Sequence, residues 1–224
     1  MKQVHLLAAR LWIIQVLTGL LLVIYIVVHT IDNGMILISR EAYEDMLKLW
    51  HSLPSWFYTL MVLGLVGIIV IHMANGIRIA SKPYKQVDVS WIHNIKLKHS
   101  GTVFWFTQVI TGSLIAIFAV WHLIVQHGAE PTMTASQSAM RVTPLVFLVY
   151  LVFLAAVMFH SFNGVRSVLI KLGIMTDKAK EALLVGFMGL LFIVFFLVGA
   201  ISMGLFIAEP ESDAKSSKLE MNST

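Results

Sequence analysis

The chain has 224 residues, of which 58% are hydrophobic and only 12% are charged, and its formal net charge is +4. This composition excludes an ordinary soluble domain and is typical of an integral membrane protein. The positive balance is explained by basic residues at the membrane surface and does not indicate nucleic-acid binding. Because the chain has no cysteine, disulfides, thiolate-bound iron-sulfur clusters and a cysteine nucleophile are excluded within it.

Five apolar segments are long enough to cross a bilayer, which takes about 20 mostly apolar residues. They are residues 11–28, 56–77, 103–125, 144–165 and 182–208. The first is too long for the apolar core of a secretory signal and lacks a small-residue cleavage site before Asp32, so we expect it in the mature chain. We predict an all-α bundle of five transmembrane helices over residues 1–208, with a polar, disordered tail at 209–224.

The connections between these segments differ in charge. Basic residues precede the first span, lie between the second and third spans, and follow the fourth, whereas the other connections carry mixed or acidic charge. The positive-inside rule therefore places the amino terminus in the cytoplasm and the carboxyl terminus outside. Residues 40–50 have apolar side chains at helical spacing with charges opposite them, which predicts a helix lying on the outer membrane surface.

An internal repeat relates the first two spans to the next two. Trp12, Gln15, Thr18, Gly19 and His29 recur at identical intervals as Trp105, Gln108, Thr111, Gly112 and His122. In the same way, His72, Asn75, Gly76 and Arg78 recur as His160, Asn163, Gly164 and Arg166. Each copy crosses the membrane twice, so the copies have one orientation, and an axis along the membrane normal should relate them. The fifth span has no counterpart and no histidine.

Four histidines lie within the spans at positions that the repeat makes equivalent. His29 and His122 are near the outer ends of outward-running helices, and His72 and His160 are near the inner ends of inward-running helices. At about 1.5 Å per residue, each pair lies roughly 8 to 10 Å from the bilayer middle, so the two levels are about 15 to 20 Å apart. One such histidine could make only an interhelical hydrogen bond, but four in equivalent positions indicate a shared purpose.

Two imidazoles at one depth on separate helices suit an iron porphyrin ligated on both faces. A zinc or copper centre would need three or four ligands converging at one point, whereas here the ligands come in twos. Iron with both axial positions taken has no open site for oxygen or substrate, so we expect two haem b groups that transfer electrons.

Polar side chains accompany the inner pair. Helical geometry brings Gln15 and Thr18, and their repeats Gln108 and Thr111, to the level of His72 and His160, where they could bind propionates or orient the imidazoles. Ordinary interhelical hydrogen bonding is the alternative. Two arginines at the cytoplasmic boundary could reach porphyrin carboxylates or serve only as membrane anchors, namely Arg78 and Arg166.

This arrangement resembles the cytochrome b membrane anchor of two-haem succinate:quinone oxidoreductases, a family that includes menaquinol:fumarate reductases. The resemblance covers all five spans, with one histidine on each of the first four, and histidine intervals of 43, 50 and 38 residues are closer to the fumarate reductase branch. It implies a subunit of a bacterial cytoplasmic-membrane complex that can dimerise. The cytoplasmic partners would be a flavoprotein with FAD, which holds the dicarboxylate active site, and an iron-sulfur protein.

The resemblance also implies roles for individual residues. His29 and His122 would hold the distal haem, and His72 and His160 the haem proximal to the hydrophilic subunits. Gln15, Trp105 and Lys171 would help to hold the proximal propionates. Menaquinone or menaquinol would react near the distal haem, with Asp45 or Glu44 as candidates for exchanging the proton, although the solvated face of the surface helix is the favoured explanation of these two acids.

One position departs from the resemblance. Some fumarate reductases of this type carry a glutamate just before the ligand of the fourth helix, proposed to carry protons across the membrane, and this chain has Met158 there. A proton path through that carboxylate is therefore not expected. Two other functions stay open: a quinone-linked cytochrome b of a hydrogenase or formate dehydrogenase, which often has two ligands on one helix, and a non-redox transporter or scaffold.

Overall fold

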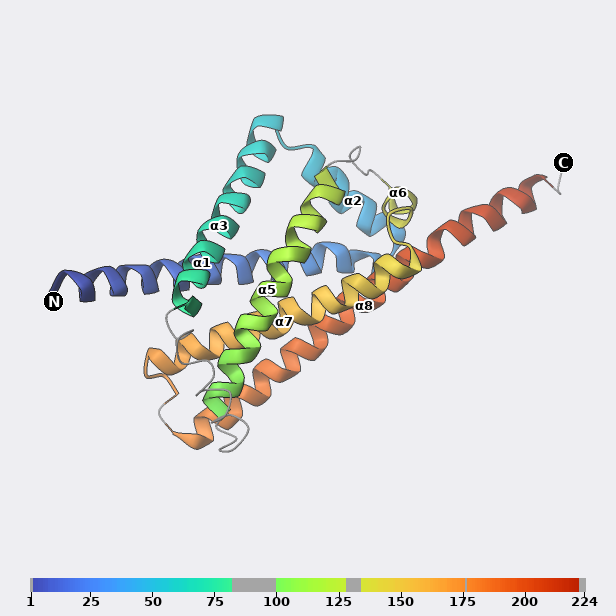
Figure 1. Cartoon of the computed structure of the whole chain (residues 1–224). Helices are drawn as coiled ribbons and strands as arrows, with labels where there is room; N and C mark the ends of the chain where they lie inside the picture. Colours follow the sequence, from blue (N-terminus) through green and yellow to red (C-terminus); the bar gives the residue numbers. More distant parts are fainter. Residues whose placement is uncertain (1, 82–99, 128–133, 176, 222–224) are drawn as a thin grey trace.

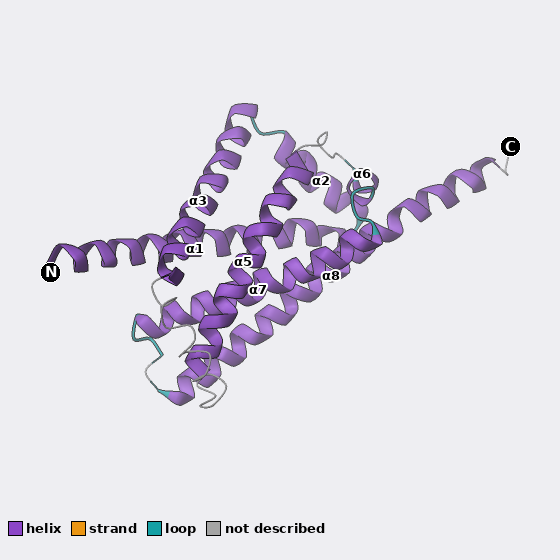
Figure 2. Ribbon diagram, viewed as in Figure 1, coloured by secondary structure: helices purple, strands orange, loops and turns teal. Residues whose placement is uncertain are grey.

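The protein is seen in a computed structural model that describes residues 2–81, 100–127, 134–175 and 177–221. Five long helices dominate it: α1 (Lys2–Gly34), α3 (Ser55–Ser81), α5 (Ser100–His127), α7 (Pro144–Lys171) and α8 (Lys178–Met221). Three short helical segments join them: η1 (Met35–Leu37), α2 (Arg40–His51) and α6 (Ala135–Ala139). Figures 1 and 2 show that the described residues form helices joined by short loops, without strands.

Five helices are long and apolar enough to cross a membrane. The spans are Ala9–Leu37, Ser55–Ile79, Val103–Val125, Pro144–Lys171 and Lys178–Ile207. The predicted fold class, an all-α membrane bundle, is therefore confirmed. The helices extend beyond several predicted spans because polar residues at an interface can continue a helix that an apolar window ends. The basic connection between the second and third spans lies largely outside the described residues, so the orientation stays a prediction.

Local sequence signals explain where several helices begin and end. The side chain of Ser39 accepts a hydrogen bond from the Ala42 amide at the start of α2, and Thr143 does the same for Val146 at the start of α7. Pro144 occupies the first turn of α7, where its missing amide costs nothing. After α7, Gly173 adopts a φ of 72°, which glycine reaches without strain.

The predicted amphipathic helix at 40–50 is present as α2, and its contacts hold the end of the bundle near α6 together. The Tyr43 ring packs on Phe206 of α8 with centroids 5.0 Å apart, and its hydroxyl lies 2.9 Å from Ser138 Oγ. Glu44 accepts a hydrogen bond from the Ala135 amide at 3.1 Å. Burial raises the pKa of the Tyr43 hydroxyl, so it stays neutral in this cluster. These contacts join α2, α6 and α8 into a cap.

The last helix runs into the tail predicted at 209–224. α8 continues to Met221 and so includes most of residues 209–224, for which we expected disorder. Alanine, glutamate and lysine in this stretch favour helix. The division into a membrane domain at 1–208 and a separate tail stays a prediction.

The repeat is visible as helix pairing. α1 packs against α3, and α5 packs against α7, while α8 lies along α7 and also contacts α1. The same buried amide closes both pairs: Asn75 Nδ2 donates to the Leu11 carbonyl at 2.6 Å, and Asn163 Nδ2 donates to the Phe104 carbonyl at 2.7 Å. Both asparagines are at least nine-tenths buried. Each hydrogen bond therefore fixes the register of a helix pair in an apolar setting.

Asn163→Ala tests this hydrogen bond. We expect the free energy of unfolding in detergent to fall by about 0.6 to 2 kcal/mol, which is the range for polar contacts between membrane helices. Denaturant titration followed by circular dichroism measures it. The matched control is Ser113→Ala, since exposed Ser113 bonds only its own helix at Val109. Equal midpoints for the two variants would contradict the role of Asn163.

Candidate functional site

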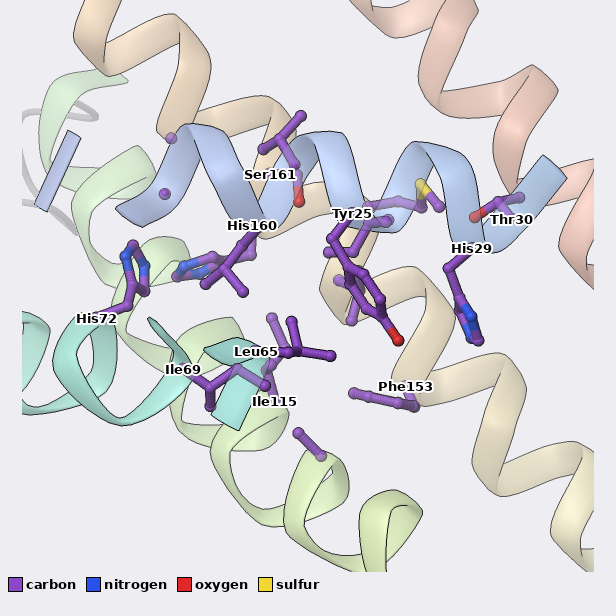
Figure 3. A pocket seen from close by; sticks show the side chains of 18 of the residues that line it. Tyr25, His29, Thr30, Leu65, Ile69, His72, Ile115, Phe153, His160 and Ser161 are labelled. Carbon is purple, nitrogen blue, oxygen red and sulfur yellow. The ribbon is translucent and has the colours of Figure 1, made fainter. Parts of the chain in front are cut away.

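A large cavity of about 2100 Å³ runs through the bundle and is lined by residues of all five long helices and α2. Typical small-molecule pockets measure about 300 to 1,000 Å³, so this one has room for more than one bulky ligand. Its walls are mainly aliphatic and aromatic side chains. All four intramembrane histidines line it, and Figure 3 shows His72 and His160 toward one end and His29 toward the other.

The histidines meet in two pairs. The rings of His29 on α1 and His122 on α5 have centroids 6.1 Å apart and planes at 75°. The rings of His72 on α3 and His160 on α7 have centroids 6.3 Å apart and planes at 79°. The structure thus brings together the two pairs that the sequence analysis placed at common depths.

The distance between the two ring centroids in each pair can be compared with the distance expected for two imidazoles that bind one metal. With metal–nitrogen bonds of about 2 Å, and about 1 Å from each nitrogen to its ring centre, two axial imidazoles on one metal have centroids about 6 Å apart. Both pairs match this value. Among the described residues, no three His, Cys, Asp or Glu side chains are placed to share one ion. Each pair is therefore suited to a planar metal complex that supplies its own in-plane ligands.

Hydrogen bonds hold the inner pair identically in both repeats. Gln15 Nε2 lies 3.2 Å from His72 Nε2, and Thr18 Oγ1 lies 3.1 Å from His72 Nδ1. The equivalent distances from Gln108 and Thr111 to His160 are 3.1 and 3.2 Å, as the repeat predicts. These contacts can orient the imidazoles, and they are also the interhelical hydrogen bonds of the alternative interpretation, so the cofactor role of these residues stays a prediction.

Two glycines make room for the same imidazoles. A Cβ on Gly19 would lie 3.1 Å from His72 Cε1, and a Cβ on Gly112 would lie 3.0 Å from His160 Cε1. Both separations are tighter than ordinary van der Waals contact. These positions of the repeat therefore need glycine because each imidazole lies directly against the backbone of the neighbouring helix.

The outer pair is held differently. The His29 ring stacks on Tyr25 with centroids 5.5 Å apart, and His122 Nδ1 lies 3.0 Å from the hydroxyl of Tyr150 on α7. Sequence reasoning missed Tyr150. A signal existed, because Tyr150 lies ten residues before His160 on α7, about 15 Å along the helix and so near the level of the outer pair.

The other predicted cofactor-binding residues line the inner part of the cavity. Arg78, Arg166, Trp105 and Lys171 all contribute to its wall. Arg166 pairs with Glu181 of α8, and its guanidinium lies 4.2 Å above the Phe104 ring. Its Nε is buried and has no hydrogen-bond partner among the described residues. That donor, beside further cations, suits a carboxylate carried by a ligand in the cavity.

The two acidic candidates for proton exchange lie elsewhere. Asp45 is 71% exposed and pairs with Lys48 at 2.9 Å. Glu44 pairs with Arg40 at 3.2 Å besides capping α6. Neither residue lines the cavity, whereas Tyr43 and Trp50 of the same helix do. The role of Asp45 or Glu44 in quinone chemistry stays a prediction.

The fold and site together define a multi-pass helical membrane protein with two stacked imidazole pairs. Residues 2–81 and 91–204 match the family of succinate dehydrogenase/fumarate reductase transmembrane subunits. The chain is also 31% identical over 173 residues to the fumarate reductase cytochrome b subunits of two Helicobacter pylori strains, covering 74% of this chain and 68% of each relative. The chain belongs to this family and is a membrane subunit of the succinate dehydrogenase/fumarate reductase type.

Gly112→Ala tests the close approach of His160. Overpacking typically costs about 1 to 3 kcal/mol of stability, which we expect to outweigh the gain in helix propensity of about 0.5 to 1 kcal/mol. The control is Gly67→Ala, because a Cβ there would meet nothing within 4 Å. Unfolding in detergent should therefore move in opposite directions for the two variants. Stabilisation of both would contradict the packing described here.

Proposed function

We propose that this chain is a dihaem cytochrome b that anchors a quinol:fumarate reductase or succinate:quinone oxidoreductase and passes electrons between menaquinone and an iron-sulfur partner. The observation that carries the proposal is the imidazole separation of 6.1 and 6.3 Å in the two pairs. A cavity of about 2100 Å³ enclosing both pairs supports two porphyrins rather than two bare ions. The cytochrome b relatives support haem b as the cofactor.

In this function, the protein would bind the two haems and hold them apart within apolar surroundings. When bound, haem would supply one-electron transfer. His29 and His122 would hold one group, and His72 and His160 the other. Gln15 contacts the inner pair and is 14 residues before His29 on α1, so the two levels are separated by about 21 Å along that helix. Apolar side chains such as Leu65, Ile69 and Ile115 line the cavity between the levels (Figure 3).

The charge distribution supports a direction for this arrangement. The cationic side chains of Arg78, Arg166 and Lys171 lie at the end of the cavity near His72 and His160. These residues would hold the propionates of the proximal haem and face a cytoplasmic iron-sulfur subunit, which a flavoprotein carrying FAD would join. Quinone would then react toward the opposite, outer end, and the amino terminus would be cytoplasmic.

Removing one ligand from each pair tests the haem assignment. His122→Ala and His72→Ala should each lower the haem content of the purified chain from two to one, because an imidazole pair needs both members. Haem extraction with reduced-minus-oxidised absorption spectra measures this. The control is His51→Ala, an exposed histidine on α2 that belongs to neither pair. Two haems in either pair variant, or none in the wild type, would disprove the proposal.

Isolation of the intact complex tests the partners. Mild detergent extraction from native membranes, with the chain tagged, should recover a flavin-containing subunit and an iron-sulfur subunit together with it. The assembly should reduce fumarate with a reduced quinone, or oxidise succinate with an oxidised one. Recovery of a hydrogenase or formate dehydrogenase subunit instead would contradict the proposed complex.

A further inference from the structure

The hydroxyl hydrogens of Thr18 and Thr111 are donated to backbone carbonyls, and this limits the hydrogen bonds that the two oxygens can make with the neighbouring histidines. Thr18 Oγ1 donates to the Ile14 carbonyl at 2.7 Å, and Thr111 Oγ1 donates to the Thr107 carbonyl at 2.6 Å. A hydroxyl has a single hydrogen, and a carbonyl can only accept. Each threonine oxygen can therefore only accept a hydrogen bond from the imidazole Nδ1 that lies 3.1 or 3.2 Å away.

The second nearby carbonyl leads to the same result. Thr18 Oγ1 lies 3.3 Å from the Gln15 carbonyl, and Thr111 Oγ1 lies 3.3 Å from the Gln108 carbonyl. Whichever carbonyl receives the hydroxyl hydrogen, none is left for the imidazole. Turning that hydrogen toward Nδ1 would leave two oxygens 2.6 or 2.7 Å apart with no hydrogen between them, which is repulsive. Both inner histidines therefore carry their proton on Nδ1.

The other imidazole nitrogen gives independent support. The amide nitrogen of Gln15 lies 3.2 Å from His72 Nε2, and that of Gln108 lies 3.1 Å from His160 Nε2. An amide nitrogen is a donor only, so with the amide in this orientation the atom facing it holds a lone pair. That unprotonated Nε2 is the atom that would bind a metal, which would then replace the glutamine amide as its partner. Two contacts per imidazole thus define one tautomer, and the repeat provides it twice.

This arrangement is confined to the inner level. Thr18 and Thr111 are at least nine-tenths buried, so water does not compete for their oxygens. At the outer level, His122 meets the Tyr150 hydroxyl, and the part of the chain that the structure describes gives the His29 ring only aromatic contacts. The two levels of the bundle therefore provide unequal hydrogen bonding to their imidazoles.

A hydrogen bond from Nδ1–H to an acceptor raises the basicity of the opposite nitrogen. A more basic axial ligand stabilises the oxidised, more positive iron relative to the reduced iron. Resting on the dihaem function proposed above, we propose that Thr18 and Thr111 are positioning residues that fix His72 and His160 in the Nδ1-protonated tautomer and thereby lower the midpoint potential of the inner haem. They act through the histidines and touch no substrate.

The experiment is a redox titration of the purified complex carrying Thr18→Val, Thr111→Val or both. Valine keeps the shape of threonine and removes only the oxygen. We expect two haems per chain, an upward shift in the midpoint potential of the inner component, a larger shift in the double variant, and an unchanged outer component. The His72→Ala variant identifies the inner component by its loss. Thr59→Val is the control, because exposed Thr59 bonds only the Ser55 carbonyl of its own helix.

Thr18→Ser and Thr111→Ser separate the oxygen from simple packing, because serine retains the acceptor. We expect both to keep the wild-type potential. If a valine variant loses the inner haem, recovery of haem and potential in the matching serine variant supports the inference, and failure to recover overturns it. Two retained haems with unmoved potentials, or a shift in the outer component alone, would also overturn it. Fewer than two haems in the wild type would instead refute the dihaem function itself.

Discussion

The constraint on which this bundle depends is the placing of four imidazoles inside apolar helices. Polar side chains at membrane depth are expensive unless they face the bundle interior and find partners. The inner histidines find them on the neighbouring helix, His72 with Gln15 and Thr18, and His160 with Gln108 and Thr111. The same polar contacts that satisfy the imidazoles also bind α1 to α3 and α5 to α7. The same hydrogen bonds therefore orient the imidazoles and pack the helices together.

The internal repeat explains why this set of polar contacts occurs twice and why it is limited to one end of the helix pairs. The asparagine, glutamine, threonine and glycine contacts recur atom for atom between the two helix pairs, and these all lie at or below the inner level. Toward the outer end, the copies diverge: Tyr25 stacks on His29, while Tyr150 bonds His122. The unrepeated α8 and the α2–α6 cap also contact that end asymmetrically. The contacts around His72 and His160 therefore follow the repeat, whereas the contacts around His29 and His122 differ between the two copies.

Much of this could be predicted from sequence because polar residues are rare in such helices. The spacing from Gln15 to His29 and from His72 to Arg78, seen twice, was enough to place the pairs at common depths, and the structure brings each pair together. Contacts between non-repeated elements could not be found this way. The pairing of Arg166 with Glu181 and the capping of α6 by Glu44 depend on how α8 and α2 fold back. No periodicity in the sequence encodes that placement.

Two sets of side chains near His72 and His160 would have opposite electrostatic effects on a haem bound there. A threonine oxygen that accepts a hydrogen bond from an imidazole makes that ring more electron-rich, which under the proposed dihaem function would favour oxidised iron. The cations of Arg78, Arg166 and Lys171, which line the cavity, would favour the reduced state of that haem, because it carries one positive charge fewer. The first influence acts through the ligand bond and involves only neutral groups, so salt does not screen it. The second acts through space, and salt screens it less at Arg166, whose side chain is only 13% exposed and pairs with Glu181. Under the proposed function, the level of His72 and His160 would thus have two separate influences on its affinity for an electron, one from buried hydroxyls and one from cations that line the cavity.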